Sequence, residues 1–249
     1  MPILDVRHLV KEYGGLRAND DISFAIDTEE LLGVIGPNGA GKTTLFNCIA
    51  RLHPVTSGQI FFDGVNVTAR KATDMARMGL ARTFQVYTAG GDLTVIENIM
   101  VGCFLRTASR IDARRRAEAI LADFNLSAFA DALVSELPVP AQKQVTMATA
   151  LGTAPKLLLL DEVAAGLTPH EIDGMMALIR HIHTDMGITV VLIEHVMDLV
   201  MNVCDRLVVI DYGRKIADGT PADIAADTEV IKAYLGERYV KEHAGDLMR

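Results

Sequence analysis

Three short runs along the chain are almost wholly apolar, at residues 31–36, 157–160 and 189–193. Continuous runs of this length, rich in Val, Ile and Leu, are typical of strands buried on both faces of a parallel sheet. After the second run, Thr168 and Glu171 form a capping box, and an apolar stripe at helical spacing continues from Ile172 to Ile182. Strands that alternate with such helices predict an α/β fold.

The start and the middle of the chain follow other patterns. Residues 3–10 and 22–26 alternate between apolar and polar positions on either side of a Tyr-Gly-Gly turn, which predicts a small N-terminal antiparallel β layer. From about residue 86 to residue 151 the strand signal fades, and residues 94–105 and 113–124 have the pattern of helices. We interpret this stretch as a helical subdomain inserted into the α/β core. Residues 221–239 are also predicted to be helical.

Composition narrows the class of protein. The 249 residues carry a formal net charge of −8 and no long basic run, which argues against a protein that grips nucleic acid by bulk charge. The three cysteines are far apart, as expected for reduced thiols in a cytosolic protein, and their spacing does not resemble a zinc site. Since no apolar run approaches the ~20 residues of a membrane span, we expect any membrane association to go through a partner.

One loop carries a pattern that binds phosphate. The buried strand at residues 31–36 leads into G-x-x-x-x-G-K-[ST], and a helical stretch follows at residues 44–50. Glycines let consecutive backbone N–H groups turn towards a phosphate, and the start of a helix adds a partial positive charge. Lys42 can reach the β- and γ-phosphates, and the Thr43 hydroxyl can hold Mg²⁺. The residues expected to cradle the nucleotide are Gly36, Pro37, Asn38, Gly39, Ala40, Gly41, Lys42, Thr43 and Thr44.

Two further strand ends supply chemistry, because α/β folds place ligands at the ends of their strands. Asp161 and Glu162 follow the apolar run at residues 157–160. Asp161 is predicted to hold Mg²⁺, and Glu162 to act as general base towards an attacking water. His195 follows the third apolar run and is predicted to donate a hydrogen bond near the γ-phosphate. His181 and His183 point to different sides of the predicted helix, so both are interpreted as structural.

The phosphate loop, the Asp161-Glu162 pair and His195 together resemble the nucleotide-binding subunits of ABC transporters, from about residue 3 to residue 236. The resemblance implies a P-loop NTPase core of the RecA-like type, with ATP and Mg²⁺ as cofactors. It implies that the ring of Tyr13 lies against adenine. It also implies that Gln85 contacts Mg²⁺ and the attacking water and senses the membrane subunits.

Four short stretches narrow the resemblance to the ATPases of branched-chain amino acid importers, a group that includes urea and amide transporters. They lie at residues 93–98, 164–167, 192–195 and 233–236. We therefore expect one ABC ATPase domain over residues 1–249. Within it, residues 1–85 and 152–235 form the catalytic core, residues 86–151 the helical subdomain and residues 236–249 a C-terminal extension.

The chain departs from the family at its defining motif, Leu-Ser-Gly-Gly-Gln or Leu-Ser-Tyr-Gly-Gln. Residues 137–141 read Leu-Pro-Val-Pro-Ala. In the family this motif binds the γ-phosphate held by the opposite subunit. Pro138 has no hydroxyl, and neither Pro138 nor Pro140 has an N–H. Losing two hydrogen bonds to a charged group costs roughly 3–6 kcal/mol. We therefore expect this chain to hydrolyse ATP at its own loop but to serve a partner's site poorly.

The resemblance implies an ATP-binding and ATP-hydrolysing subunit that powers an importer of branched-chain amino acids or related amides. It implies transmembrane permease partners and a second ATPase subunit, in a heterodimer or a homodimer, at the inner face of the cell membrane. Contact with nucleic acid or with the cargo is not expected. One alternative is a nucleotide-binding regulatory subunit with weak hydrolysis. Another is an ABC ATPase of a different system, such as cluster assembly or lipid export. A DNA-acting ATPase is disfavoured by the acidic charge and the lack of a long coiled-coil insertion.

Overall fold

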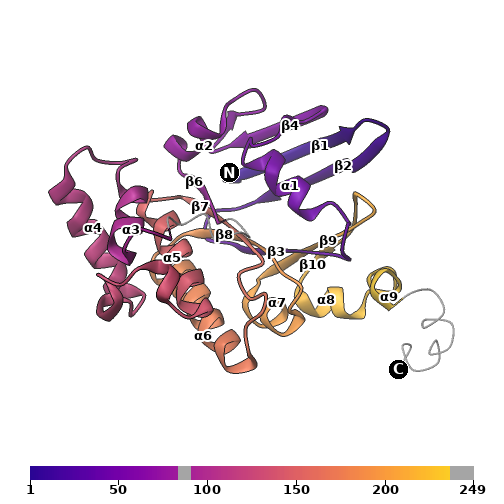
Figure 1. Cartoon of the computed structure of the whole chain (residues 1–249). Helices are drawn as coiled ribbons and strands as arrows, with labels where there is room; N and C mark the ends of the chain where they lie inside the picture. Colours follow the sequence, from indigo (N-terminus) through magenta and orange to yellow (C-terminus); the bar gives the residue numbers. More distant parts are fainter. Residues whose placement is uncertain (84–90, 236–249) are drawn as a thin grey trace. The chain divides into compact units, whose positions relative to one another are not determined.

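The computed structural model describes residues 1–83 and 91–235, and the chain divides into two compact units (Figure 1). The first unit holds Met1–Lys71 and Val191–Arg249, and the second holds Ala72–Val190. The three strands predicted from apolar runs are confirmed as β3 (Leu31–Ile35), β7 (Leu157–Asp161) and β8 (Thr189–Ile193), and every residue in them is buried. The chain passes from the second unit to the first within β8.

The first unit contains the predicted antiparallel layer. Its strand order is β2-β1-β4-β5, and each neighbouring pair is antiparallel. These strands are longer than the alternating pattern predicts. In β1, register shifts between Leu9 and Lys11 and between Lys11 and Glu12 break the alternation where the predicted strand ends. The strands are β1 (Leu4–Tyr13), β2 (Leu16–Ile26), β4 (Ser57–Phe62) and β5 (Val65–Asn66).

The same unit holds the strand that leads into the phosphate loop. β3 pairs in parallel with β9 (Arg206–Asp211), which pairs antiparallel with β10 (Arg214–Gly219). Helix α1 (Lys42–Ile49) follows the loop and contacts β1 and β2. Helix α7 (Met197–Val203) precedes β9.

The prediction that residues 221–239 are helical is confirmed for residues 221–226 and 228–235. The chain forms α8 (Pro221–Ala226) and α9 (Thr228–Leu235), and the residues after 235 lie outside the described part. Asp227 divides the two helices because its backbone is extended and its Oδ1 accepts a hydrogen bond from the Glu229 N–H at 2.7 Å. This is the chemistry of an N-cap, and it starts a new helix.

The second unit is mainly helical around two parallel strands, β6 (Leu80–Arg82) and β7. Helix α3 (Val95–Cys103) packs against α4 (Arg110–Asp123) and α5 (Val139–Gly152), which confirms helices at residues 94–105 and 113–124. Thr94 and Thr168 begin α3 and α6 (Pro169–Arg180) with capping boxes. Helix α2 (Ala72–Met78) precedes β6, and a π-helical turn (His181–Asp185) ends α6.

Candidate nucleotide-binding site

The phosphate loop has at each end a glycine at which a side chain would collide with the backbone of a neighbouring strand. Gly36 has φ +150°, and a Cβ there would lie 1.9 Å from the Ile210 carbonyl oxygen on β9. Gly41 has φ +101°, and its Cβ would lie 2.2 Å from the Ala18 carbonyl oxygen on β2. Both backbone angles belong to the region that glycine adopts without penalty. The loop is therefore packed directly against two neighbouring strands.

Hydrogen bonds hold the middle and the end of the loop. The Gly213 N–H, in the turn between β9 and β10, donates to the Ala40 carbonyl at 2.9 Å. The fully buried Asn19 donates from Nδ2 to the Gly41 carbonyl at 3.1 Å. Asn38 and Gly39, at the tip, are exposed. The loop thus has a fixed base and an accessible tip.

Lys42 lies inside this loop. Its side chain donates from Nζ to the carbonyl oxygens of Gly36 at 2.7 Å and Pro37 at 2.9 Å, and the residue is only 5% exposed. It is the first residue of α1, whose N-cap is Gly41, and the first turn of this helix contains no acidic residue. The N–H groups of a first helical turn have no intrahelical partner and favour an anion. Positive charge therefore gathers where the sequence predicts phosphate, with Thr43 and Thr44 in the same turn.

Tyr13 is the last residue of β1 and is 43% exposed. Its hydroxyl lies 2.5 Å from Nδ1 of His53, and the Lys11 ammonium lies 4.5 Å from the centre of its ring. Burial, with a smaller contribution from Cys48, raises the pKa of Tyr13. The phenol therefore keeps its proton at neutral pH.

Asp161 ends β7 and is 2% exposed. Its Oδ2 accepts a hydrogen bond from Nη2 of Arg82 at 2.7 Å, and its N–H donates to the Thr83 hydroxyl at 3.2 Å. Arg82 ends β6, the parallel neighbour of β7. The sequence motifs do not predict this buried partner of Asp161. The signal that could have indicated it is an arginine directly after Leu80 and Ala81, in an apolar stretch.

Glu162 follows Asp161 in a backbone conformation that is uncommon for a residue other than glycine, with φ +51°. The Lys143 ammonium, on α5, donates to the carbonyl oxygens of Ala165 at 2.6 Å and Glu162 at 3.3 Å. Glu162 is half-buried. The turn that carries this carboxylate is therefore held by hydrogen bonds to its backbone.

The remaining predicted residues divide between the units. His195 is in the first unit, which also holds Tyr13 and the whole phosphate loop. Asp161 and Glu162 belong to the second unit. Gln85 lies outside the described residues. His181 pairs through Nδ1 with Asp185 at 2.7 Å, and His183 faces the Ile188 carbonyl at 3.3 Å, as expected for structural histidines.

The departure from the family motif lies at the start of α5. Pro138 is the N-cap and makes no side-chain capping bond, and Pro140 lies in the first turn. A helix tolerates proline there because the missing N–H has no intrahelical acceptor. The helix therefore forms normally. Pro140 nevertheless removes one backbone N–H from the first turn, and in the family this end of the helix binds phosphate.

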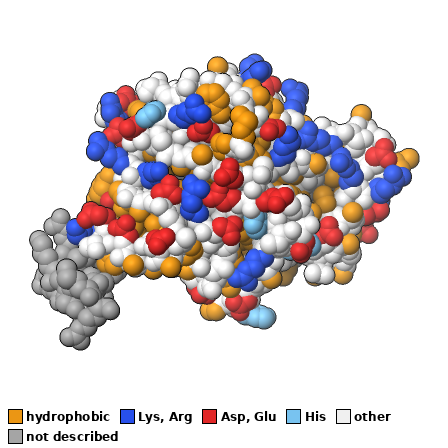
Figure 2. All heavy atoms as spheres, turned by 180° about the vertical axis from the view of Figure 1, so that it is seen from behind, with side chains coloured by type: hydrophobic (Ala, Val, Ile, Leu, Met, Phe, Trp, Pro, Cys, Tyr) orange, Lys and Arg blue, Asp and Glu red, His pale blue; other side chains and the backbone are white. Residues whose placement is uncertain are grey.

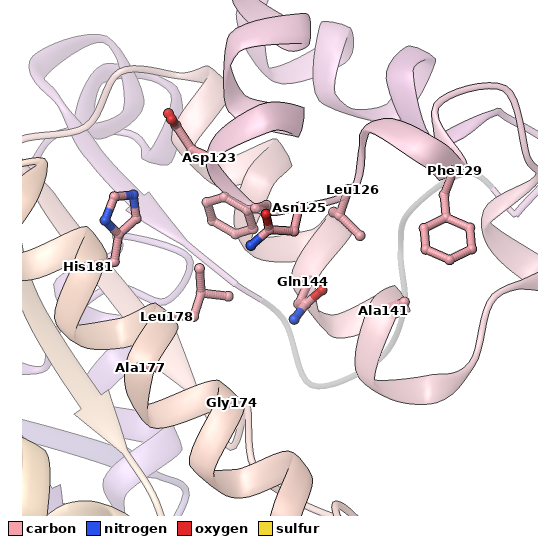
Figure 3. A pocket seen from close by; sticks show the side chains of 11 residues that line it. Asp123, Asn125, Leu126, Phe129, Ala141, Gln144, Gly174, Ala177, Leu178 and His181 are labelled. Atoms are coloured by element: carbon pink, nitrogen blue, oxygen red, sulfur yellow. The ribbon is translucent and has the colours of Figure 1, made fainter.

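A cavity of about 530 Å³ lies in the second unit, among the end of α4, α5 and α6 (Figure 3). Leu126 lines it on one side, and Gln144 and His181 bring polar groups to it. Phe124 is also among the residues that line it. The residues predicted to bind nucleotide are not among those that line this cavity. It is therefore distinct from the candidate nucleotide site.

The state of the cysteines and the mixture of charges on the surface are those expected from the composition. Cys48, Cys103 and Cys204 are buried and unpaired as disulfides, and burial raises the pKa of each. On the face that Figure 2 presents, acidic side chains lie among the Lys and Arg side chains. Across residues 1–83 and 91–235, no helix has both the length and the apolar character needed to cross a membrane.

The chain is similar to known proteins over most of its length. Residues 19–165 match the family model of the ABC transporters, and residues 214–240 match a model for branched-chain amino acid ATP-binding cassette transporters. The high-affinity branched-chain amino acid transport ATP-binding protein BraF of Pseudomonas aeruginosa is 39% identical, over 95% of this chain and 98% of BraF. Its counterpart LivG of Escherichia coli K12 is 37% identical over the same shares of the two chains.

Solved structures agree with these matches. A nucleotide-free ATP-binding cassette from an ABC transporter has a TM-score of 0.87 and 29% identity, over 95% of this chain and 100% of that one. The ADP conformation of the ATP-binding cassette MJ1267 has a TM-score of 0.86 and 30% identity over the same shares. A family model matches more than half of the chain, its relatives have nearly equal length, and the solved structures have the same fold. This chain therefore belongs to the ABC transporter family.

Proposed function

We propose that this chain is the ATP-binding and ATP-hydrolysing subunit of an importer for branched-chain amino acids or related amides. The observation that carries the proposal is the phosphate loop, in which the buried Lys42 ammonium and the start of α1 lie together. The substrate class is supported by the names of BraF and LivG and by the match over residues 214–240.

The loop binds the triphosphate. Backbone N–H groups between residues 36 and 44 surround the phosphate oxygens, and Lys42 adds a full positive charge at the β- and γ-phosphates. Tyr13, in the same unit, offers an exposed aromatic ring to the adenine base. Phosphoryl transfer depends mostly on positioning and on stabilisation of charge, so these groups contribute to catalysis as well as to affinity.

The donor set suits Mg²⁺. Thr43 and Asp161 offer a hydroxyl and a carboxylate, and Gln85 adds an amide oxygen; Mg²⁺ prefers oxygen ligands of this kind. When bound, the ion would neutralise charge that develops on the β- and γ-phosphate oxygens. Arg82 keeps the Asp161 carboxylate oriented, since it holds Oδ2 at 2.7 Å.

Hydrolysis is assigned to three side chains. Glu162 accepts a proton from the attacking water as general base, Gln85 orients that water, and His195 donates a hydrogen bond to the γ-phosphate. Glu162 is suited to its role by position, because it directly follows the buried end of β7.

The wider arrangement is part of the same proposal. Residues 1–249 form one ABC ATPase domain, with a catalytic core at 1–85 and 152–235, a helical subdomain at 86–151 and an extension at 236–249. The subunit is cytoplasmic and peripheral, bound to transmembrane permeases at the inner face of the membrane. Because α5 lacks the family's serine and glycines, the second ATPase subunit is a different chain with an intact motif.

The change Glu162→Gln tests the hydrolytic assignment. The carboxamide cannot accept the proton of water, so we expect the rate of ATP hydrolysis to fall by about 10²–10⁴, the usual contribution of a general base. The Kd for ATP should change little, because the phosphate loop is intact. Steady-state hydrolysis and equilibrium ATP binding measure the two quantities. Full hydrolysis by the Glu162→Gln variant would remove Glu162 from the mechanism.

A regulatory subunit with weak hydrolysis is the second candidate, and the two prolines at the start of α5 favour it. Turnover measured with and without an ATPase partner that has an intact motif separates the two functions. An ATP-hydrolysing subunit becomes active in the mixture, and the Glu162→Gln change abolishes the gain. A regulatory subunit leaves the activity unaffected by Glu162→Gln.

A further inference from the structure

The ring of Tyr13 is held on one face by a buried cation. Lys11 and Tyr13 are two residues apart on β1, and the Lys11 ammonium lies 4.5 Å from the ring centre. Lys11 itself is only 8% exposed. A cation over an aromatic face is attracted by the ring quadrupole, and the attraction grows when water is excluded. A flat ligand that stacks on Tyr13 would therefore use the opposite face of the ring.

The hydroxyl of the same ring is held by a residue from another segment. His53 lies after α1, and its Nδ1 is 2.5 Å from the Tyr13 hydroxyl. The two rings meet edge to face, with centres 5.9 Å apart and planes at 81°. The backbone N–H of His53 donates to the Asn47 carbonyl of α1 at 3.1 Å, which anchors this residue to the helix that begins in the phosphate loop.

These contacts define the direction of the hydrogen bond. The pKa of Tyr13 is raised by burial, so the phenol is protonated, and its O–H can donate to Nδ1 of His53 in the tautomer that carries its proton on Nε2. Together the contacts limit rotation of a ring that is 43% exposed and joined to the end of a hairpin. A rigid platform loses less entropy when a ligand stacks on it.

We propose that His53 is a positioning residue for the nucleotide base: through its hydrogen bond it fixes the Tyr13 ring at the angle on which adenine stacks. The inference rests on the proposed function, because it requires Tyr13 to contact the base. His53 connects this platform to α1, so the base and the triphosphate are held by parts of the chain that share one rigid helix.

A double-mutant cycle on the full-length chain tests this role. Tyr13→Phe keeps the ring and removes the hydroxyl, and His53→Leu removes the acceptor. We expect each change to weaken ATP binding by about two- to tenfold, the range for one neutral hydrogen bond. The double variant should bind ATP no more weakly than either single variant, since all three lack the same bond. His53→Asn, whose side-chain oxygen can replace Nδ1 as acceptor, should restore most of the affinity.

Inorganic tripolyphosphate is the matched control ligand, because it occupies the phosphate loop without a base. Its Kd should be the same in all of these variants. Independent, additive losses in the double variant, or equal losses for tripolyphosphate, would overturn the role of His53. Tyr13→Leu separates this failure from failure of the proposed function. If removing the whole ring leaves ATP affinity unchanged, Tyr13 does not contact the base, and both the contact and the role of His53 fall.

Discussion

Among single residues, Arg82 and Asp161 show how a site residue depends on a partner far along the chain. Their side chains are 6% and 0% exposed, and the ion pair measures 2.7 Å. A charge in such a place is tolerated because the opposite charge and hydrogen bonds accompany it. The carboxylate predicted to hold Mg²⁺ therefore depends on a cation 79 positions away.

Removing the cation should be costly for stability. In Arg82→Met the Asp161 carboxylate stays buried without its partner, and we expect the free energy of unfolding to fall by about 3–5 kcal/mol. Arg114→Met is the matched control, because Arg114 pairs with Glu118 at 2.9 Å on an exposed surface of α4. That change should cost less than about 1 kcal/mol. Urea denaturation followed by circular dichroism measures both values, and similar losses in the two variants would contradict the prediction.

Site residues that belong to a local sequence motif could be predicted, and those outside such a motif could not. Lys42, Thr43 and Asp161 belong to local patterns whose spacing carries their chemistry, so the sequence locates them without knowledge of the fold. Arg82 and His53 have no such pattern. Their partners are 79 and 40 residues away, and the pairing exists only once the strands and α1 are in place.

Among the elements, α5 departs most from the family pattern. Its first turn contains Pro140, and Pro138 caps it without a side-chain bond. The backbone at the start of α5 is that of an ordinary helix. Pro138 has no hydroxyl, however, and neither Pro138 nor Pro140 has a backbone N–H. The departure is thus chemical and leaves the backbone helical.

The double variant Pro138→Ser with Pro140→Gly restores both kinds of donor. If the proposed trans contact limits the purified homodimer, its hydrolysis rate should rise by about 10²–10⁴, the factor that corresponds to two hydrogen bonds to a charged group. Ser at the N-cap should also favour the helix by ~1 kcal/mol. Thermal unfolding distinguishes this stabilisation from the catalytic effect. An unchanged hydrolysis rate in a stably folded variant would argue against a motif made defective by its prolines.

Elements with strong end signals were predictable, and elements made by pairing were not. The capping box at Thr168 predicts a helix start that the structure confirms. The structure shows a second capping box at Thr94, where the helix predicted from residue 94 begins. β6 has only three residues, too few for a period, and it forms because β7 pairs with it. The break at Asp227 also has a signal in the sequence, since Asp is a favoured N-cap residue.

For the whole molecule, nucleotide binding should appear as stability. A ligand that binds only the folded state stabilises it by about 2.7 kcal/mol at one hundred times its Kd, which corresponds to roughly 5–10 °C in Tm for a chain of this size. We expect this shift with Mg-ATP, and a smaller one when EDTA removes the metal. Lys42→Met should abolish the shift relative to its own ligand-free Tm. Differential scanning calorimetry measures it, and an equal shift in the Lys42→Met variant would contradict binding at this loop.

The hydrogen bonds of Lys42 lower the entropy that its side chain would lose when a triphosphate binds. A free lysine side chain has up to about 2 kcal/mol of rotamer entropy to lose. Here two carbonyl oxygens of the loop already hold the ammonium. The side chain therefore loses most of this entropy when the chain folds. The ammonium is already ordered when the anion binds, so its ordering does not weaken the binding of the anion.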